Sequence, residues 1–191
     1  DRLDGGDGDD ILDGGAGDDT YVVDSNTDTI SDEDGNDTVE SSVDYTLGAD
    51  VENLTFKGSN DFTGTGNTGD NVITGGTGND TLAGGVGNDT AVFTGPVTNY
   101  ALSANSTTFN VADVSGGTGL DTVFNFETLR IGGTDYCGDA ASGWFSAEDE
   151  LTDPSFLEVT SAASGRGVLF GVEHACRTWP VGLAASGAGA I

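Results

Sequence analysis

Single large apolar residues recur every nine residues in two parts of the chain, and a turn rich in glycine and aspartate precedes each of them. Leu12 and Tyr21 show this spacing near the start, and Ile73 and Leu82 show it further along. With U for the apolar residue, these segments read GGxGxDxUx. The glycines permit tight turns, and xUx is a short strand. Since nine residues cannot bury a core alone, the pattern predicts stacked strands whose U side chains form a thin inward ladder.

Four segments match this nonapeptide strictly: GGDGDDILD (5–13), GGAGDDTYV (14–22), GGTGNDTLA (75–83) and GGVGNDTAV (84–92). A variant, GNTGDNVIT, occupies residues 66–74. The frame also extends backwards, because Asp1 lies nine residues before Asp10 and Leu3 nine before Leu12. DRLD (1–4) is therefore the tail of a repeat without its glycines, and we expect the chain to start inside a repeat array, as a fragment or a processed product.

Glycine and aspartate in these turns favour a cation site built from oxygen atoms. Glycine leaves carbonyl oxygens unobstructed, and aspartate supplies a charged oxygen on a short arm. Stacked turns would surround one cavity with six or more oxygen ligands, which suits Ca²⁺ better than Zn²⁺. The candidate metal ligands are Asp1, Gly5, Gly6, Gly8, Asp10, Gly14, Gly15, Gly17, Asp19, Gly66, Gly69, Asn71, Gly75, Gly76, Gly78, Asp80, Gly84, Gly85, Gly87 and Asp89.

The repeat resembles the RTX (haemolysin-type calcium-binding nonapeptide repeat) family. The resemblance implies an all-β chain with a right-handed parallel β-roll, a β-solenoid, and a β-rich C-terminal capping region. Two nonapeptides would make one coil, and several Ca²⁺ ions would bind, each between turns two repeats apart. The resemblance implies two edges of ligands in each block: Asp1 and Asp19 opposite Asp10, and Asn71 and Asp89 opposite Asp80.

Two residues depart from the consensus. Asn71 keeps an oxygen ligand but loses the charge, so we expect a weaker site there. Ala91 stands at a U position and thins the apolar ladder, although Val92 and Phe93 are expected to compensate.

Residues 23–65 break the glycine frame but still read as short strands. The segments DTI (28–30), DTVESSVDYTL (37–47) and VENLTF (51–56) carry apolar residues with turn residues between them. We expect the roll to continue through 23–65 as longer, less regular coils like the irregular rungs between RTX blocks. A flexible spacer is the alternative.

The segment DEDGND (32–37) invites comparison with an EF-hand loop. The comparison fails, because Ile30 stands at the first acidic position and Ser41 at that of the final glutamate. We therefore expect a solvated acidic turn in which Asp32, Asp34 and Asp37 bind a cation only loosely.

The pattern predicts three segments: a roll over 1–93, built from repeat blocks 1–22 and 66–92, a hairpin and strand cap over 94–133, and a C-terminal region over 134–191. In the second, YALSA and TFNVAD alternate as a hairpin would, and DTVFNFETLRI (121–131) reads as a strand pair. A fifth strict match, GGTGLDTVF (116–124), stands outside the frame, so we expect a hairpin turn there rather than calcium binding by Asp121.

Residues 134–191 are predicted to cap the roll or to carry an export signal. SAEDEL (146–151) could start a helix with Ser146 as its N-cap. Cys137 and Cys176 are the two cysteines; one disulfide and two separate thiols both remain open.

Composition narrows the partners. The formal net charge is −28, from 33 acidic residues against 5 basic ones, which disfavours nucleic acid and anionic membranes. Aspartates number 25 and glutamates 8, a bias that suits tight turns and hard cations. Neither a signal peptide nor an apolar run long enough to span a bilayer is visible, so we expect no membrane insertion.

The sequence offers no recognisable catalytic constellation. His174 is the only histidine, and no G-x-S-x-G motif occurs. We expect a non-enzymatic, calcium-binding module of a secreted bacterial protein that uses a one-step export route and folds on Ca²⁺ outside the cell. The alternatives are a structural subunit of an extracellular layer, fibre or adhesin, with self-association through the roll ends, and the non-catalytic tail of a secreted enzyme.

Overall fold

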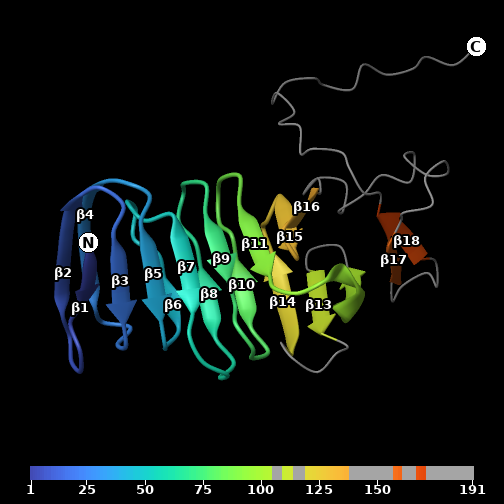
Figure 1. The fold of residues 1–191 in the computed structure, drawn as a ribbon, viewed down its shortest axis with the longest axis horizontal. Coiled ribbons are helices and arrows are strands. Elements are labelled where there is room, and N and C mark those ends of the chain that lie inside the picture. The colour runs from blue at the N-terminus through green and yellow to red at the C-terminus, as the bar shows by residue number, and fades with distance from the viewer. Residues whose placement is uncertain (105–108, 114–118, 138–156, 161–166, 171–191) are drawn as a thin grey trace, which may run out of the picture.

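The chain winds into a roll with parallel strands on two faces (Figure 1). The computed structural model describes residues 1–104, 109–113, 119–137, 157–160 and 167–170. Their helical structure is the single 3-10 turn η1 (Val97–Asn99), and none of it reaches the length and hydrophobicity that a bilayer crossing requires. The expected all-β roll is confirmed.

One face is an eight-stranded sheet, parallel except for its last strand. Its strands in spatial order are β1 (Arg2–Asp4), β3 (Thr20–Val23), β5 (Thr38–Ser41), β7 (Asn53–Phe56), β9 (Val72–Thr74), β11 (Thr90–Phe93), β15 (Thr128–Ile131) and β16 (Thr134–Cys137). β16 pairs with β15 antiparallel.

The opposite face comprises two sheets. Near the N-terminus, β2 (Ile11–Ala16) pairs with β4 (Thr29–Asp34) in parallel. Further along, six strands follow in the order β12 (Tyr100–Ala104), β13 (Phe109–Asp113), β14 (Leu120–Phe124), β10 (Thr81–Ala83), β8 (Thr63–Thr65) and β6 (Tyr45–Thr46). A separate antiparallel pair joins β17 (Leu157–Thr160) to β18 (Gly167–Phe170).

The register aligns the U positions of the repeat. Leu3 pairs with Tyr21, and Tyr21 pairs with Val39, so two nonapeptides make one coil. Tyr21 and Val39 are fully buried, so each coil adds apolar side chains to one continuous core.

The roll continues through residues 23–65, and the spacer alternative is wrong. β5 pairs in parallel with β7, and β7 pairs in parallel with β9. The expectation of longer coils is also wrong at one step. Val39 pairs with Leu54, so this coil is shorter than the regular one.

The parallel roll also extends beyond residue 93, where the sequence pattern placed its end. Leu82 pairs in parallel with Val123, and Ala91 pairs in parallel with Leu129. The predicted hairpin is present as the antiparallel pair β12–β13, and it lies within this last coil. The two strands expected as a pair in 121–131, β14 and β15, instead belong to opposite faces.

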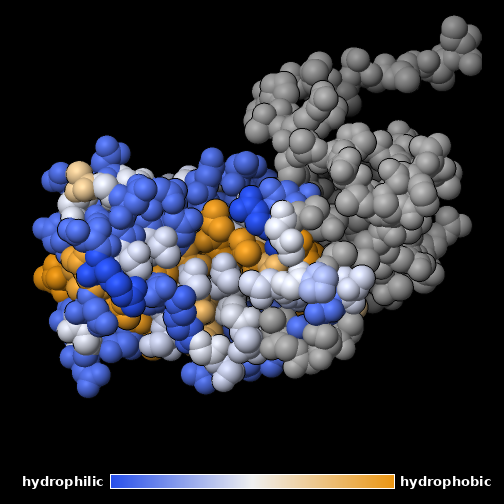
Figure 2. Space-filling view, viewed as in Figure 1, coloured by the Kyte–Doolittle hydropathy of each residue, from blue (hydrophilic) through white to orange (hydrophobic). Residues whose placement is uncertain are grey.

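Aromatic side chains fill the places where the apolar ladder is thin. Phe93 is buried next to Ala91, and its ring meets that of Tyr100 edge-on at 5.8 Å. Gly64 occupies a ladder position opposite Leu82, and a Cβ on Gly64 would lie 2.6 Å from the ring of Phe56. These close contacts show that the core is narrow. Hydrophilic residues cover much of the visible face of the roll (Figure 2).

Several predictions for the C-terminal region concern residues outside the described ranges. These are the helix at 146–151, the cap or export region beyond residue 137 apart from β17 and β18, and the surroundings of Cys176 and His174.

Candidate calcium sites

The residue before most strands of the roll is acidic or an amide and lies at an edge of the roll. At the first edge, before strands of the eight-stranded sheet, these residues are Asp1, Asp19, Asp37, Glu52, Asn71, Asp89 and Glu127. At the second edge they are Asp10, Asp28 and Asp80, joined by Asp121, which pairs with Asp80 through the same register. The candidate ligands of each block thus lie at two edges, as the resemblance implied.

One carboxylate oxygen of these residues bonds the backbone of the preceding coil. The Asp19 N–H donates to Asp37 Oδ1 at 2.7 Å, and the Asp80 N–H donates to Asp121 Oδ1 at 2.8 Å. We call this series the carboxylate ladder; its acceptors are Asp19, Asp28, Asp37, Glu52, Asp80, Asp89, Asp121 and Glu127. The ladder fixes each acid against the neighbouring coil.

The second oxygen of several of these aspartates is buried without a hydrogen-bond partner. This holds for Oδ2 of Asp10, Asp19, Asp37, Asp80 and Asp89. Four of these side chains belong to residues that are at most 3% exposed, Asp10 being the exception. A buried polar oxygen without a partner is costly, and a buried charge more so. These oxygens therefore require a compensating proton or cation.

The basic side chains of the described residues do not supply that charge. Arg2 and Lys57 both pair with Glu40, at 2.7 and 2.9 Å, and Arg130 pairs with Asp135. Within the described ranges, no ion pair joins a basic side chain to the carboxylate ladder. Compensation must come from protons or from bound cations.

Burial raises the pKa of several ladder carboxyls and so shifts them toward the protonated form. It raises the pKa of Asp80 and of Asp89 to about 6, against the lowering effect of the backbone N–H that each accepts. It raises the pKa of Asp121 to about 7, against the lowering effect of the Asp80 N–H, while the charge of the Asp80 carboxylate also raises it. A divalent cation would hold these groups ionised.

The glycines leave the space that the carboxylates occupy. A Cβ on Gly75 would lie 2.5 Å from Asp80 Oδ2, and one on Gly84 would lie 2.7 Å from Asp89 Oδ2 and collide with the Asn125 carbonyl oxygen. Gly15 has a φ of +80°, which disfavours any side chain there. Gly14 and Gly15 lie at the end of β2, and the other predicted glycines lie outside the strands: Gly5, Gly6, Gly8, Gly17, Gly66, Gly69, Gly75, Gly76, Gly78, Gly84, Gly85 and Gly87.

The neighbouring coils also contribute carbonyl oxygens. A Cβ on Gly78 would collide with the Asn60 carbonyl oxygen, and one on Gly87 with that of Gly69. Carboxylate and carbonyl oxygens from successive coils therefore converge at the turns. An all-oxygen donor set with unpartnered carboxylates fits Ca²⁺. Binding of the ion by the individual residues stays a prediction.

Asn71 behaves differently from the aspartates. Its Oδ1 accepts the Asn67 N–H at 2.7 Å, and its Nδ2 donates to the carbonyl oxygens of Val51 and Glu52 at 3.3 Å. The amide thus satisfies carbonyls that would face a cation at an aspartate step. The sequence predicted only a weaker cation site at Asn71. In the structure, the Asn71 amide also occupies two carbonyl oxygens that could otherwise bind a cation.

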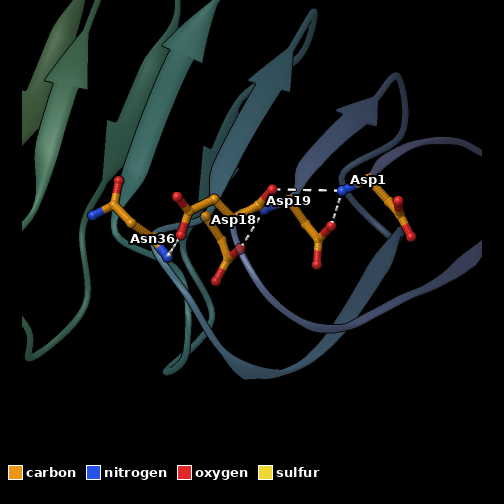
Figure 3. A network of polar contacts seen from close by, with 5 residues as sticks. Asp1, Asp18, Asp19 and Asn36 are labelled. Atoms are coloured by element: carbon orange, nitrogen blue, oxygen red, sulfur yellow. Dashed lines mark hydrogen bonds and ion pairs between the residues drawn. The ribbon is translucent and has the colours of Figure 1, made fainter.

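A second, outer ladder runs along the exposed turn residues and was not predicted from the sequence. Asp18 Oδ1 accepts the Asn36 N–H at 3.0 Å, and Asp70 Oδ1 accepts the Asn88 N–H at 2.8 Å. Figure 3 shows both ladders at the start of the roll, where the Asp1 nitrogen contacts Asp19 and Asn36 contacts Asp18. Asp18 therefore bonds the following coil, whereas the adjacent Asp19 bonds the preceding coil.

Sequence reasoning also missed five acids of the carboxylate ladder: Asp28, Asp37, Glu52, Asp121 and Glu127. The missed signal is the triplet of acid, threonine and apolar residue, as in DTI at 28–30 and DTV at 37–39, which continues after the glycines disappear. The expectation that Asp121 has no partner in register is wrong, since Asp121 is 2% exposed and bonds Asp80.

The acidic segment 32–37 is not the solvated turn that we expected. Asp37 is fully buried, Asp32 is half-buried and Asp34 is exposed. Oxygens of Asp19, Asp32 and Asp37 lie within 4.8 Å of one another.

Comparison with known proteins agrees with this geometry. The model of the RTX calcium-binding nonapeptide repeat matches in four copies, over residues 1–21, 22–42 and 63–91. No curated protein and no solved structure matches the chain. The matched ranges include 22–42, where the glycine consensus is lost but the carboxylate ladder continues. The matched segments, 1–21, 22–42 and 63–91, are therefore RTX calcium-binding nonapeptide repeats.

Proposed function

We propose that the chain is the calcium-folded module of a secreted bacterial protein, and that it acts by binding rather than by catalysis. The observation that carries this proposal is the series of buried Oδ2 atoms without partners in Asp19, Asp37, Asp80 and Asp89. Each of these aspartates already uses Oδ1 to hold the preceding coil. A cation at Oδ2 would therefore stabilise the contact between coils directly.

The charge of the chain makes folding conditional on that cation. A net charge of −28 opposes compaction, and 32 glycines add to the entropy lost on folding. Ca²⁺ bound only by the folded chain contributes its binding free energy to folding. A chain of this kind stays unfolded at low cytosolic calcium, passes an export channel and folds outside the cell, as the resemblance to RTX proteins implies.

Far-ultraviolet circular dichroism of the whole chain tests this proposal. We expect little β signal in EDTA, and a cooperative gain of β signal on titration to millimolar Ca²⁺. Mg²⁺ at the same concentration is the control, and we expect a weaker response because Mg²⁺ dehydrates reluctantly and demands octahedral geometry. A β signal that chelation leaves unchanged contradicts the proposal.

Light scattering in the same titration distinguishes the structural alternative. A module that folds as a single chain gives a constant particle size once folding is complete. Growth of the particles with added Ca²⁺ would instead favour a subunit that stacks through its roll ends.

A further inference from the structure

The segment 32–37 contains a departure from the repeat that changes one site. Residues 32–40, DEDGNDTVE, follow 14–22, GGAGDDTYV, at the distance of one coil. By sequence spacing Asp32 corresponds to Gly14 one coil earlier, although in the structure a bulge between β2 and β4 pairs Asp32 with Gly15. At Gly14, a Cβ would lie 2.6 Å from Asp19 Oδ2 and would also collide with the Tyr21 hydroxyl. A side chain at Gly14 would therefore point toward the Asp19 carboxylate.

The Asp32 side chain adds a third carboxylate to a pair already present. Oxygens of Asp19, Asp32 and Asp37 lie within 4.8 Å of one another. Asp19 and Asp37 come from the turns before β3 and β5, and Asp32 comes from β4 on the opposite face. Three chain segments therefore converge on one point.

The polar atoms at this point are buried and have no hydrogen-bond partner outside the cluster itself, where Asp32 interacts with Tyr21 and Asp37. They are Asp19 Oδ2, Asp37 Oδ2, both oxygens of Asp32 and the Tyr21 hydroxyl. Asp19 and Asp37 are 3% and 0% exposed. Three carboxylates this close repel one another strongly when water is excluded, so the cluster is stabilised by a proton or by a cation between them, and a cation would hold all three ionised.

We propose that Asp19, Asp32 and Asp37 together bind one Ca²⁺, and that this is the tightest cation site of the described residues. The inference rests on the proposed calcium-binding function and adds a third carboxylate to the two that the repeat supplies. Affinity for Ca²⁺ increases with the number of charged ligands. For comparison, the step from Asn71 to Asp89 offers one carboxylate and one amide.

Terbium luminescence of the whole chain, excited through tyrosine, measures this site because the Tyr21 hydroxyl lies at it. Tb³⁺ is the probe, and competition with Ca²⁺ gives the calcium affinity. We expect Asp32→Asn and Asp32→Gly each to weaken the tightest phase at least about tenfold. Asp32→Gly restores the repeat consensus, so we expect it to reach the wild-type β signal at saturating Ca²⁺.

Two controls assign the signal. Asp34→Asn removes an exposed carboxylate from the same turn, and we expect wild-type affinity. Tyr21→Phe should remove most of the emission from the tightest phase, while the calcium concentration needed for folding changes little.

The outcomes separate this inference from the proposed function. Unchanged affinity of the tightest phase in both Asp32 variants, with calcium-dependent folding intact, overturns the three-carboxylate site alone. A wild-type chain that neither folds with Ca²⁺ nor binds Tb³⁺ overturns both.

Discussion

The Asp37 carboxylate joins two coils of the roll, because its Oδ1 accepts the Asp19 N–H at 2.7 Å while its Oδ2 stays buried without a hydrogen-bond partner. The same division of labour recurs at Asp80 and Asp89. In each of these aspartates, Oδ1 accepts a backbone hydrogen bond that holds two coils together, and Oδ2 is the oxygen that we propose binds a cation. Under the proposed function, a cation at Oδ2 would couple the stacking of coils to calcium binding.

Replacement of one ladder aspartate should weaken calcium binding without preventing the coil contact. Asp89→Asn keeps an oxygen that can accept the Asn71 N–H but removes the charge. We expect the calcium needed for half-maximal folding to rise about tenfold, measured by circular dichroism and calorimetric titration.

The matched control for this change is Asp70→Asn, which alters an exposed acid of the outer ladder. We expect a near wild-type calcium requirement, because the Asn88 N–H still finds an oxygen and no buried charge is lost. Equal effects of the two substitutions would mean that net charge, and not the buried oxygen, sets the response.

The reverse change should create a cation site. Asn71→Asp removes the amide that donates to the Val51 and Glu52 carbonyl oxygens. We expect those carbonyls and the new carboxylate to bind one additional Ca²⁺, seen as an increase in stoichiometry in calorimetry. Asn88→Asp makes the same charge change at an exposed turn residue, and a gain there as well would refute the assignment.

Lowering the pH should stabilise the fold of the calcium-free chain but should weaken calcium binding. The pKa values of Asp80 and Asp89 in the folded chain are about 6, and that of Asp121 is about 7, against about 4 for an unfolded aspartate. Without calcium, the folded chain binds more protons between these values, so its stability is lost as the pH rises from about 4 to about 7.

We therefore expect the chelated chain to gain β signal at about pH 5 relative to about pH 7.5. In the presence of calcium, protons compete with the ion, so the calcium midpoint should rise over the same acidification. Circular dichroism at constant ionic strength measures both. Identical β signals of the chelated chain at the two pH values would argue against the raised pKa values.

Truncation of the core should destabilise the calcium-bound roll. Leu82 is fully buried and pairs with both Gly64 and Val123. We expect Leu82→Ala to lower the free energy of unfolding in saturating Ca²⁺ by about 2–5 kcal/mol, measured by urea denaturation. Ile11→Ala, at a side chain that is 80% exposed, should change it by less than about 0.5 kcal/mol.

The nine-residue frame alone placed Asp19, Asp80 and Asp89 at the edges of a parallel roll. This was predictable because a repeat that turns and advances by a fixed number of residues stacks equivalent positions on each other. The triplet of acid, threonine and apolar residue carried the same information through 28–39 without the glycines. Local pattern was sufficient wherever consecutive coils had equal length.

Only the tertiary structure decided which partner each side chain meets. The inserted β12–β13 hairpin separates Asp80 from Asp121 by 41 residues, so no fixed spacing relates the two, yet they bond at 2.8 Å. Likewise, the sequence could not show that Asp32 faces Asp19, because those side chains come from opposite faces of the roll. Spacing determines which residues stack, whereas contacts across the coil depend on how the backbone closes around the narrow core.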